Sequence, residues 1–198
     1  PPPLLPDDGP QYSGRVRVAA TAHGWMSYWL MPATVSDPAS SPIIVVLEGG
    51  PGYASQTQAT NGCGPYTLAF DGSAVTRSVG PSWNTNATLL FLDQPLGVGY
   101  STLAAGSPNT ASSAENARLM MQVMQALWWG TDDDDKSGGH GGRSSSPLHP
   151  ELAPDKTQGR PLHIFGHSYG GRTGPALATA WLQGAPPAMA DSLAGGIL

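Results

Sequence analysis

Residues 162–170 read Leu-His-Ile-Phe-Gly-His-Ser-Tyr-Gly, and this stretch decides the fold of the chain. The apolar run at 162–165 is typical of a strand buried on both faces. The next five residues match Gly-x-Ser-x-Gly, a sharp strand-to-helix turn that exposes a serine hydroxyl. Glycines flank the serine because neighbouring backbone passes close to such a turn. Residues 175–182, Pro-Ala-Leu-Ala-Thr-Ala-Trp-Leu, predict the helix that must follow.

The motif alone has little weight. A chain with 26 glycines among its 198 residues is expected to contain roughly 0.3 such matches by chance. Ser168 in an ordinary glycine-rich turn therefore stays open as an alternative. The buried run before the motif and the helix after it favour the strand-turn-helix interpretation, in which Ser168 is a nucleophile.

Two further apolar runs, at 43–47 and 89–92, have the same character as the run at 162–165. Each of the three ends in a turn that contains Gly or Asp. Uninterrupted apolar runs of this length are typical of parallel strands covered by helices on both faces. The chain is therefore predicted to have an α/β fold. Shorter runs at 15–19 and 25–31 predict an antiparallel hairpin near the N-terminus.

A helix is expected over 112–128. Its apolar residues recur at helical spacing, and Ser112 with Glu115 forms a capping box at the start. We interpret its apolar face as core packing, which is more common than a ligand site.

A serine nucleophile needs N–H donors for the oxyanion that forms during attack. In this type of turn one donor is the backbone N–H of the next residue, here Tyr169, and the other comes from an earlier strand-to-loop turn. Residues 48–52, Glu-Gly-Gly-Pro-Gly, directly follow the run at 43–47 and are a suitable source. Because Pro51 has no N–H, we assign the second donor to Gly50. A plain Gly-Gly-Pro-Gly turn remains the alternative.

Composition excludes several classes of partner. Nine Lys and Arg against 14 Asp and Glu give a net charge of −5, so no basic field favours nucleic acid or an acidic membrane. No apolar stretch approaches the length of roughly 18 residues that spans a membrane. The single cysteine, Cys63, cannot form an intrachain disulfide, and no Cys-His spacing suggests zinc. The sequence indicates no metal and no cofactor.

The chain divides into an extended proline-rich arm at 1–10 and a domain at 11–198 that carries a low-complexity insertion at 130–160. The insertion is predicted to be solvated and poorly ordered. Its run Asp132 to Asp135 and nearby His140 could suggest a metal site. A charge run in low-complexity sequence is usually solvated, so we predict no metal site there.

Several motifs occur along nearly the whole chain in a recognisable order. They are Gln11 to Gly14, Trp25 to Trp29, Gly49 to Gly52, Ser82 to Asn84, Leu90 to Ser101 and Ser168 to Ala178. Together they resemble the N-terminal part of the serine carboxypeptidase family, in the α/β-hydrolase superfamily. The resemblance implies an α/β-hydrolase-like, mostly parallel sheet flanked by helices. It also implies a peptidase that removes C-terminal residues from peptides through an acyl-enzyme on Ser168, and a structural role for Asp93.

The catalytic triad of this family follows the order Ser, Asp or Glu, His. All five histidines of this chain precede Ser168, and Asp191 is the only acid after it. The resemblance therefore implies an incomplete domain, truncated before the catalytic Asp and His, which a C-terminal segment or chain would supply. We expect the 198 residues alone to be inactive.

Three positions depart from the family pattern for binding a substrate's terminal carboxylate. The family has Asn, Glu and Glu where this chain has Glu48, Gly62 and His167. An ionised Glu48 would repel a carboxylate, unless its protonation or a charged His167 offsets the repulsion. We take Glu48, Gly49 and His167 as candidate substrate-binding residues. Alternatives are an esterase, acyltransferase or aminopeptidase on the same scaffold, or a non-catalytic binding protein.

A secretory, vacuolar or extracellular location is implied by resemblance alone. Family members commonly carry a disulfide from a cysteine just after Gly-Gly-Pro-Gly, where this chain has Tyr53. The cysteine content therefore does not support that location.

Overall fold

The computed structural model of the chain describes residues 9–19, 23–130, 146–155 and 160–197. The strands are β1 (Tyr12–Ala19), β2 (His23–Met31), β3 (Ile43–Leu47), β4 (Tyr66–Leu68), β5 (Val75–Arg77), β6 (Thr88–Leu92), β7 (Thr102–Leu103), β8 (Leu162–Gly166) and β9 (Leu193–Ile197). The helices are α1 (Gln58–Asn61), α2 (Ser113–Trp128), α3 (Gly170–Gly184) and α4 (Pro187–Ala190), and short 3₁₀ turns lie at Ser55–Thr57, Trp83–Thr85 and Pro150–Leu152.

The main sheet has the strand order β1-β2-β6-β3-β8-β9, with β7 beside β2. Strands β6, β3, β8 and β9 are parallel neighbours, whereas β1 and β2 form an antiparallel hairpin that joins β6. This mixed sheet with a parallel centre confirms the predicted α/β-hydrolase-like fold. The small β4–β5 hairpin was not predicted from the sequence.

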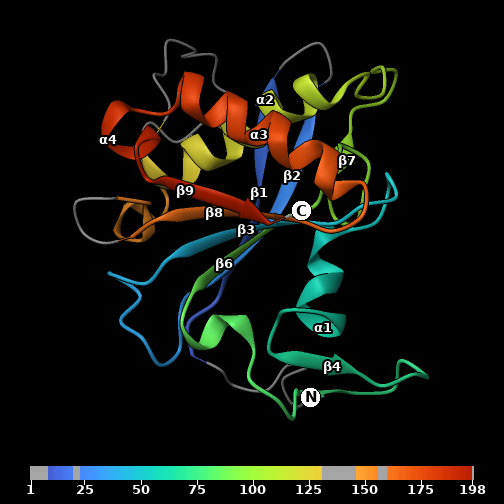
Figure 1. Cartoon of the computed structure of the whole chain (residues 1–198). Coiled ribbons are helices and arrows are strands. Elements are labelled where there is room, and N and C mark those ends of the chain that lie inside the picture. Colours follow the sequence, from blue (N-terminus) through green and yellow to red (C-terminus); the bar gives the residue numbers. More distant parts are fainter. Residues whose placement is uncertain (1–8, 20–22, 131–145, 156–159, 198) are drawn as a thin grey trace.

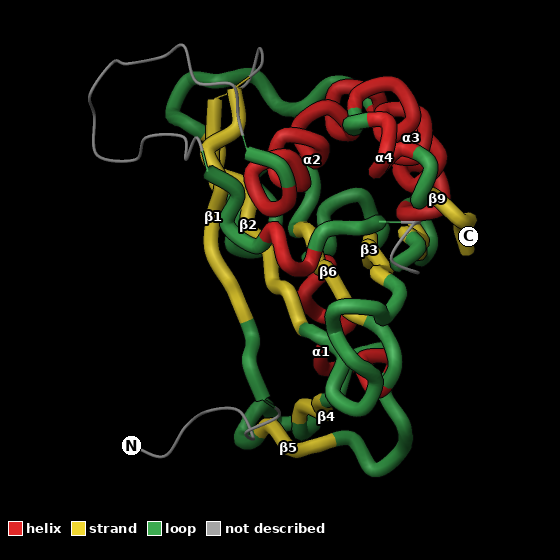
Figure 2. Tube along the Cα trace, turned by 90° about the vertical axis from the view of Figure 1, so that its left-hand side faces the viewer, coloured by secondary structure: helices red, strands yellow, loops and turns green. Residues whose placement is uncertain are grey.

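Helices α2, α3 and α4 cover one face of the sheet, and α1 with the β4–β5 hairpin lies on the other (Figure 1). Figure 2 shows the same two layers from the side. The central strands supply apolar side chains to both faces in alternation. Val45 and Leu90 pack into the core beneath α2 and α3, whereas Val46 and Phe91 pack into the smaller core around α1. The continuous apolar runs therefore reflect burial on both faces, as predicted.

Helix α2 begins as the sequence predicts. The Glu115 N–H donates to the Ser112 hydroxyl at 3.1 Å, which satisfies one of the free N–H groups of the first turn. The Glu115 carboxylate accepts from the N–H of Ala111 at 2.8 Å, one residue before the position that a standard capping box would use.

Helix α3 starts at Gly170, earlier than the predicted 175–182, and carries Pro175 within it. It is anchored to α2 by Trp181, which is fully buried and lies edge-on to Trp128 and Trp129 at ring-centroid distances of 5.9 and 5.7 Å. Such aromatic pairs each contribute about 0.5–1.5 kcal/mol beyond the area that they bury.

Most of the predicted insertion at 130–160 lies outside the described residues, and its described part at 146–155 contains both exposed and buried residues. Leu152 and Ala153 are buried in the main core, and the Arg160 guanidinium donates to the Glu151 and Ala153 carbonyls at 2.6 and 2.8 Å. The apolar residues between the prolines pack onto the fold although the segment's overall composition is polar. The run Asp132 to Asp135 and His140 lie outside the described residues.

Residues 1–8 of the predicted N-terminal arm also lie outside the described part of the chain. Gly9 and Pro10 precede β1 without regular secondary structure, and β1 begins at Tyr12.

Candidate functional site

Ser168 lies in the turn between β8 and α3, at the carboxyl end of the central strands. It has φ 56° and is the only non-glycine residue with positive φ among those that the structure describes. A β-carbon on Gly166 would lie 2.3 Å from the Gly170 carbonyl oxygen, and one on Gly170 would lie 2.4 Å from the Leu47 carbonyl oxygen. Both flanking positions therefore require glycine. The backbone holds Ser168 in a strained conformation of the kind found at functional sites, and Ser168 is exposed.

The loop after β3 lies directly against this turn. A β-carbon on Gly49 would approach the Tyr169 nitrogen to 2.6 Å and the Ser168 β-carbon to 2.8 Å. The Gly49 N–H donates to its neighbour Glu48 at 2.9 Å, whereas neither the Gly50 nor the Tyr169 N–H donates to any other residue that the structure describes. The structure thus places the loop that contains Gly50 against the turn that contains Tyr169.

Glu48 and His167 contact each other beside the nucleophile. They are 119 positions apart in the chain, and the His167 Nδ1 lies 2.5 Å from the Glu48 Oε1. The same Oε1 accepts from Gly49, and the Glu48 Oε2 accepts from the side-chain amide of Gln58 in α1. The Glu48 side chain is 10% exposed and the His167 side chain 60% exposed. Glu48 therefore orients His167, whose second ring nitrogen is left for other partners.

The pKa of the Glu48 carboxyl lies below its ordinary value. Burial alone raises this pKa, but the hydrogen bonds from Gln58, His167 and Gly49 outweigh the burial. Glu48 is therefore held as a carboxylate, and the charge that faces His167 is negative.

No general base lies at Ser168 within the described residues. The Ser168 hydroxyl makes no hydrogen bond to a histidine or a carboxylate there. His149 stacks on Tyr12, and Asp191 is exposed at the end of α4.

A family model described as serine carboxypeptidase matches residues 3–134. The chain belongs to the serine carboxypeptidase family. A vacuolar serine-type carboxypeptidase, ATG42, of Saccharomyces cerevisiae is 34% identical over 113 residues, which are 57% of this chain and 21% of that protein. Carboxypeptidase Y of the same yeast is 30% identical over 149 residues, 75% of this chain and 23% of the relative.

This serine carboxypeptidase chain thus spans about a fifth of the length of the curated relatives that it matches. Among solved structures, juvenile hormone epoxide hydrolase from the silkworm Bombyx mori aligns with a TM-score of 0.46 and 14% identity. That alignment covers 93% of this chain and 34% of the other.

Asp93 lies fully buried in this family member. Its carboxylate accepts from the N–H groups of Gln56 and Tyr100 at 3.1 and 3.0 Å, and its carbonyl accepts from the Ser101 hydroxyl. Burial raises the pKa of the Asp93 carboxyl, and the backbone hydrogen bonds only partly oppose that effect. These contacts hold the loop after β6 against the loop after β3, which agrees with a structural role.

Sequence reasoning missed Gln58, Gln94 and Asn116. Gln58 completes the contacts of Glu48, and the Gln94 amide donates to the Glu48 carbonyl at 2.8 Å. Asn116, from the first turn of α2, donates in turn to Gln94. Position 116 lies on the apolar face of a predicted amphipathic helix, so a polar residue there was a usable signal.

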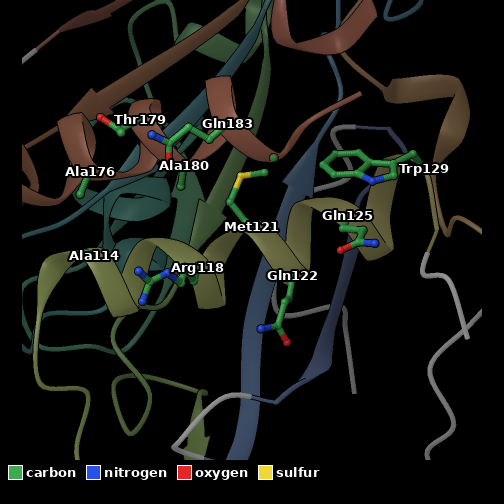
Figure 3. A pocket seen from close by; sticks show the side chains of 11 residues that line it. Ala114, Arg118, Met121, Gln122, Gln125, Trp129, Ala176, Thr179, Ala180 and Gln183 are labelled. Carbon is green, nitrogen blue, oxygen red and sulfur yellow. The ribbon is translucent and has the colours of Figure 1, made fainter. Parts of the chain in front are cut away.

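A cavity of about 470 Å³ lies away from Ser168, between α2 and α3 (Figure 3). Arg118 and Gln122 of α2 and Thr179 and Gln183 of α3 lie on its two sides. Its lining contains no carboxylate, histidine or cysteine, so we assign it no chemistry.

Within the described residues, no group of three or more His, Cys, Asp or Glu side chains could hold a metal ion. None of the described helices combines the length and the apolar character needed to cross a membrane.

Proposed function

We propose that this chain is part of a serine carboxypeptidase that releases C-terminal residues from peptides through an acyl-enzyme on Ser168. The observation that carries the proposal is the exposed Ser168, held at φ 56° next to Tyr169 and in close contact with the loop that contains Gly49 and Gly50. The N–H groups of Gly50 and Tyr169 donate to no other described residue. Strain at the nucleophile and preorganised donors at the oxyanion are the two features that acyl transfer requires of the backbone.

In the proposed reaction the Ser168 Oγ attacks the carbonyl carbon of the last peptide bond. The N–H groups of Gly50 and Tyr169 stabilise the oxyanion, whose collapse expels the amine of the leaving residue and forms the acyl-enzyme. Water then hydrolyses the ester. A His outside these 198 residues accepts the Ser168 proton and gives it to the leaving amine, and an Asp orients that His and stabilises its charged form. A further segment or chain supplies both residues.

For the substrate's terminal carboxylate we propose His167 as the binding group, oriented by Glu48 and adjoining Gly49. The Glu48 charge is partnered by His167, and both Glu48 oxygens accept hydrogen bonds from within the fold. Glu48 is therefore not available for a substrate α-amine, which weighs against aminopeptidase activity. An exposed imidazolium can instead donate to a carboxylate.

An esterase or acyltransferase on the same scaffold, or a non-catalytic binding protein, remains the competing proposal. Peptides with a C-terminal amide separate the first two from a carboxypeptidase, because only a carboxypeptidase needs the free carboxylate. For location we propose the vacuole or another secretory compartment. The support is the vacuolar location in the name of the yeast relative.

The decisive experiment is fluorophosphonate labelling of the complete natural protein, with mass spectrometry to locate the adduct. We expect the adduct on Ser168 and none in Ser168→Ala. The control Ser40→Ala, whose serine is exposed and distant in sequence from the motif, should label normally. Peptide turnover by Ser168→Ala should fall on the order of 10⁶-fold. Labelling that survives in Ser168→Ala would overturn the assignment, and a wild-type protein that takes no label would favour the binding protein.

A further inference from the structure

A second, smaller pocket borders the oxyanion loop on the side of α2. Its volume is about 130 Å³, and it lies between the loops after β3 and β6 and the first turns of α2 and α3. Pro51 and Tyr169 form the wall nearest Ser168, while Gln94, Asn116 and Thr173 form a buried floor. Pro51, Ala111 and Ser112 are exposed, so the pocket opens to solvent at its rim.

Two buried polar atoms in this pocket have no hydrogen-bond partner. They are the Thr110 Oγ1 and the Asn116 Oδ1, two of only four such side-chain atoms among the described residues. A buried polar atom without a partner costs about 1–3 kcal/mol. Asn116 is 3% exposed, so bulk water does not relieve that cost at its amide oxygen. The concentration of both atoms in one small pocket beside Tyr169 points to a ligand that supplies the missing bonds.

The orientation of the Asn116 amide is fixed from within the fold. Its N–H₂ group donates to the Gln94 Oε1 at 2.5 Å, and the Gln94 N–H₂ group donates to the Glu48 carbonyl at 2.8 Å. Each amide in this chain of contacts has a defined donor side. The Asn116 oxygen is therefore the atom presented to the pocket, and it can only accept.

The pocket lining selects against charged ligands. A carboxylate would place its oxygens against the Asn116 oxygen, where both groups are acceptors. An ammonium group would face the first turns of both α2 and α3, the positive ends of their helix dipoles. None of the lining residues is itself charged. A hydroxyl fits both open atoms, because it donates to the Asn116 oxygen and accepts from the Thr110 hydroxyl.

We propose that this pocket binds the hydroxyl of a serine or threonine side chain on the acyl side of the scissile bond. This inference rests on the proposed function, in which His167 holds the leaving residue on the opposite side, next to α1. A volume of about 130 Å³ corresponds to roughly four water molecules at about 30 Å³ each, enough for a side chain of that size. Thr110 and Asn116 are then specificity-determining residues.

The test compares threonine with valine, which have the same shape, at the acyl position of otherwise identical peptides cleaved by the complete protein. We expect kcat/KM for the threonine peptide to exceed that for the valine peptide by about tenfold, the value of one or two net hydrogen bonds. In Thr110→Val and in Asn116→Leu this ratio should fall toward one. The control Thr179→Val, on the exposed face of α3, should keep the wild-type ratio.

The outcomes separate this inference from the proposed function. A protein that labels at Ser168 and turns over peptides, but has a threonine-to-valine ratio near one, would show that ordinary water fills the pocket. A high ratio that persists in both Thr110→Val and Asn116→Leu would place hydroxyl recognition elsewhere. Either result overturns the pocket assignment and leaves the proposed function standing. Because Thr110→Val removes a buried oxygen that has no partner, we expect that variant to unfold at or above the wild-type temperature.

Discussion

The two sides of Ser168 differ in how their polar groups are used. On the side of α1, the Glu48 carboxylate has its oxygens bonded to Gly49, Gln58 and His167. On the side of α2, the Thr110 and Asn116 oxygens are buried without a partner. We call the first the closed side, because its polar atoms are bonded within the fold. The second is the open side, because its polar atoms are available to a ligand.

This difference separates the polar groups that contribute to stability from those that can contribute to substrate selectivity. Polar atoms that form hydrogen bonds within the fold stabilise the folded state. Such atoms cannot bond a ligand as well, except where the group is still exposed, as His167 is. Polar atoms that the fold leaves open destabilise it and are available for recognition. The two sides should therefore respond to substitution in opposite ways.

The largest effect should come from Gly49→Ala, which disrupts the point where both sides meet. The new β-carbon would lie 2.6 Å from the Tyr169 nitrogen and 2.8 Å from the Ser168 β-carbon, and backbone must move to relieve the overlap. We expect kcat/KM for peptides to fall by 100-fold or more, because a shift of about 1 Å at such a site costs on the order of 10² in rate.

The matched control is Gly184→Ala in α3, where the added β-carbon would meet the Met121 methyl at 3.6 Å, an ordinary contact. It should keep full activity, with stability unchanged or raised by up to about 1 kcal/mol. If Gly49→Ala also kept full activity, the close packing of this loop against the nucleophile would be wrong.

A moderate effect is expected from Glu48→Leu, which removes the centre of the closed side. The donors of Gly49, Gln58 and His167 lose their acceptor, and we expect the free energy of unfolding to fall by about 1–3 kcal/mol in urea titrations. The chain offers a comparison in the His149–Glu151 pair, whose atoms are 3.5 Å apart and whose Glu151 side chain is 59% exposed. Glu151→Leu should cost less than about 1 kcal/mol. Equal losses in the two variants would contradict the contrast between a buried and a surface pair.

The smallest effect should be the loss of folding stability on acidification, and we expect it to come from Glu48 on the closed side. The pKa of Glu48 is lowered in the folded state, so its stabilisation is fully present above the ordinary carboxyl pKa of about 4.3. That stabilisation is lost as the pH falls through the lowered value. We expect the difference in unfolding free energy between wild type and Glu48→Gln to be constant near neutral pH and to shrink under acid conditions.

Urea titrations of both proteins at a series of pH values measure this difference. The pKa of Asp93 is shifted in the opposite direction, but Asp93 is present in both proteins. Its contribution to the pH dependence therefore largely cancels in the difference between them. A difference that grows on acidification would reverse the sign and exclude an ionised Glu48.

The sequence predicted the elements whose pattern is local. Three apolar runs became β3, β6 and β8, and Ser112 with Glu115 marked the start of α2, because burial and capping leave a signature within a few residues. Helix α3 was placed too late because Pro175 is a typical helix start, whereas tertiary packing begins the helix at Gly170. The burial of Leu152 and Ala153 was not predicted, because it depends on contacts with distant parts of the chain that composition does not report.

The candidate site was predicted in part for the same reason. The Gly-x-Ser-x-Gly turn and the loop at 48–52 are local motifs, and the structure places them in contact. Other contacts of the site join residues far apart in the chain. Glu48 contacts His167, and Gln94 bonds to both Glu48 and Asn116. No spacing rule in a single sequence encodes such pairings, which depend on the strand order.

That strand order also dictates when the site can exist during folding. Glu48 and His167 meet only after β8 has added beside β3, which closes a loop of 119 residues. Closing long loops costs entropy before any contact compensates for it, so such pairings tend to form late. The nucleophile, its oxyanion donors and the contact between Glu48 and His167 should thus form together in one late step of folding.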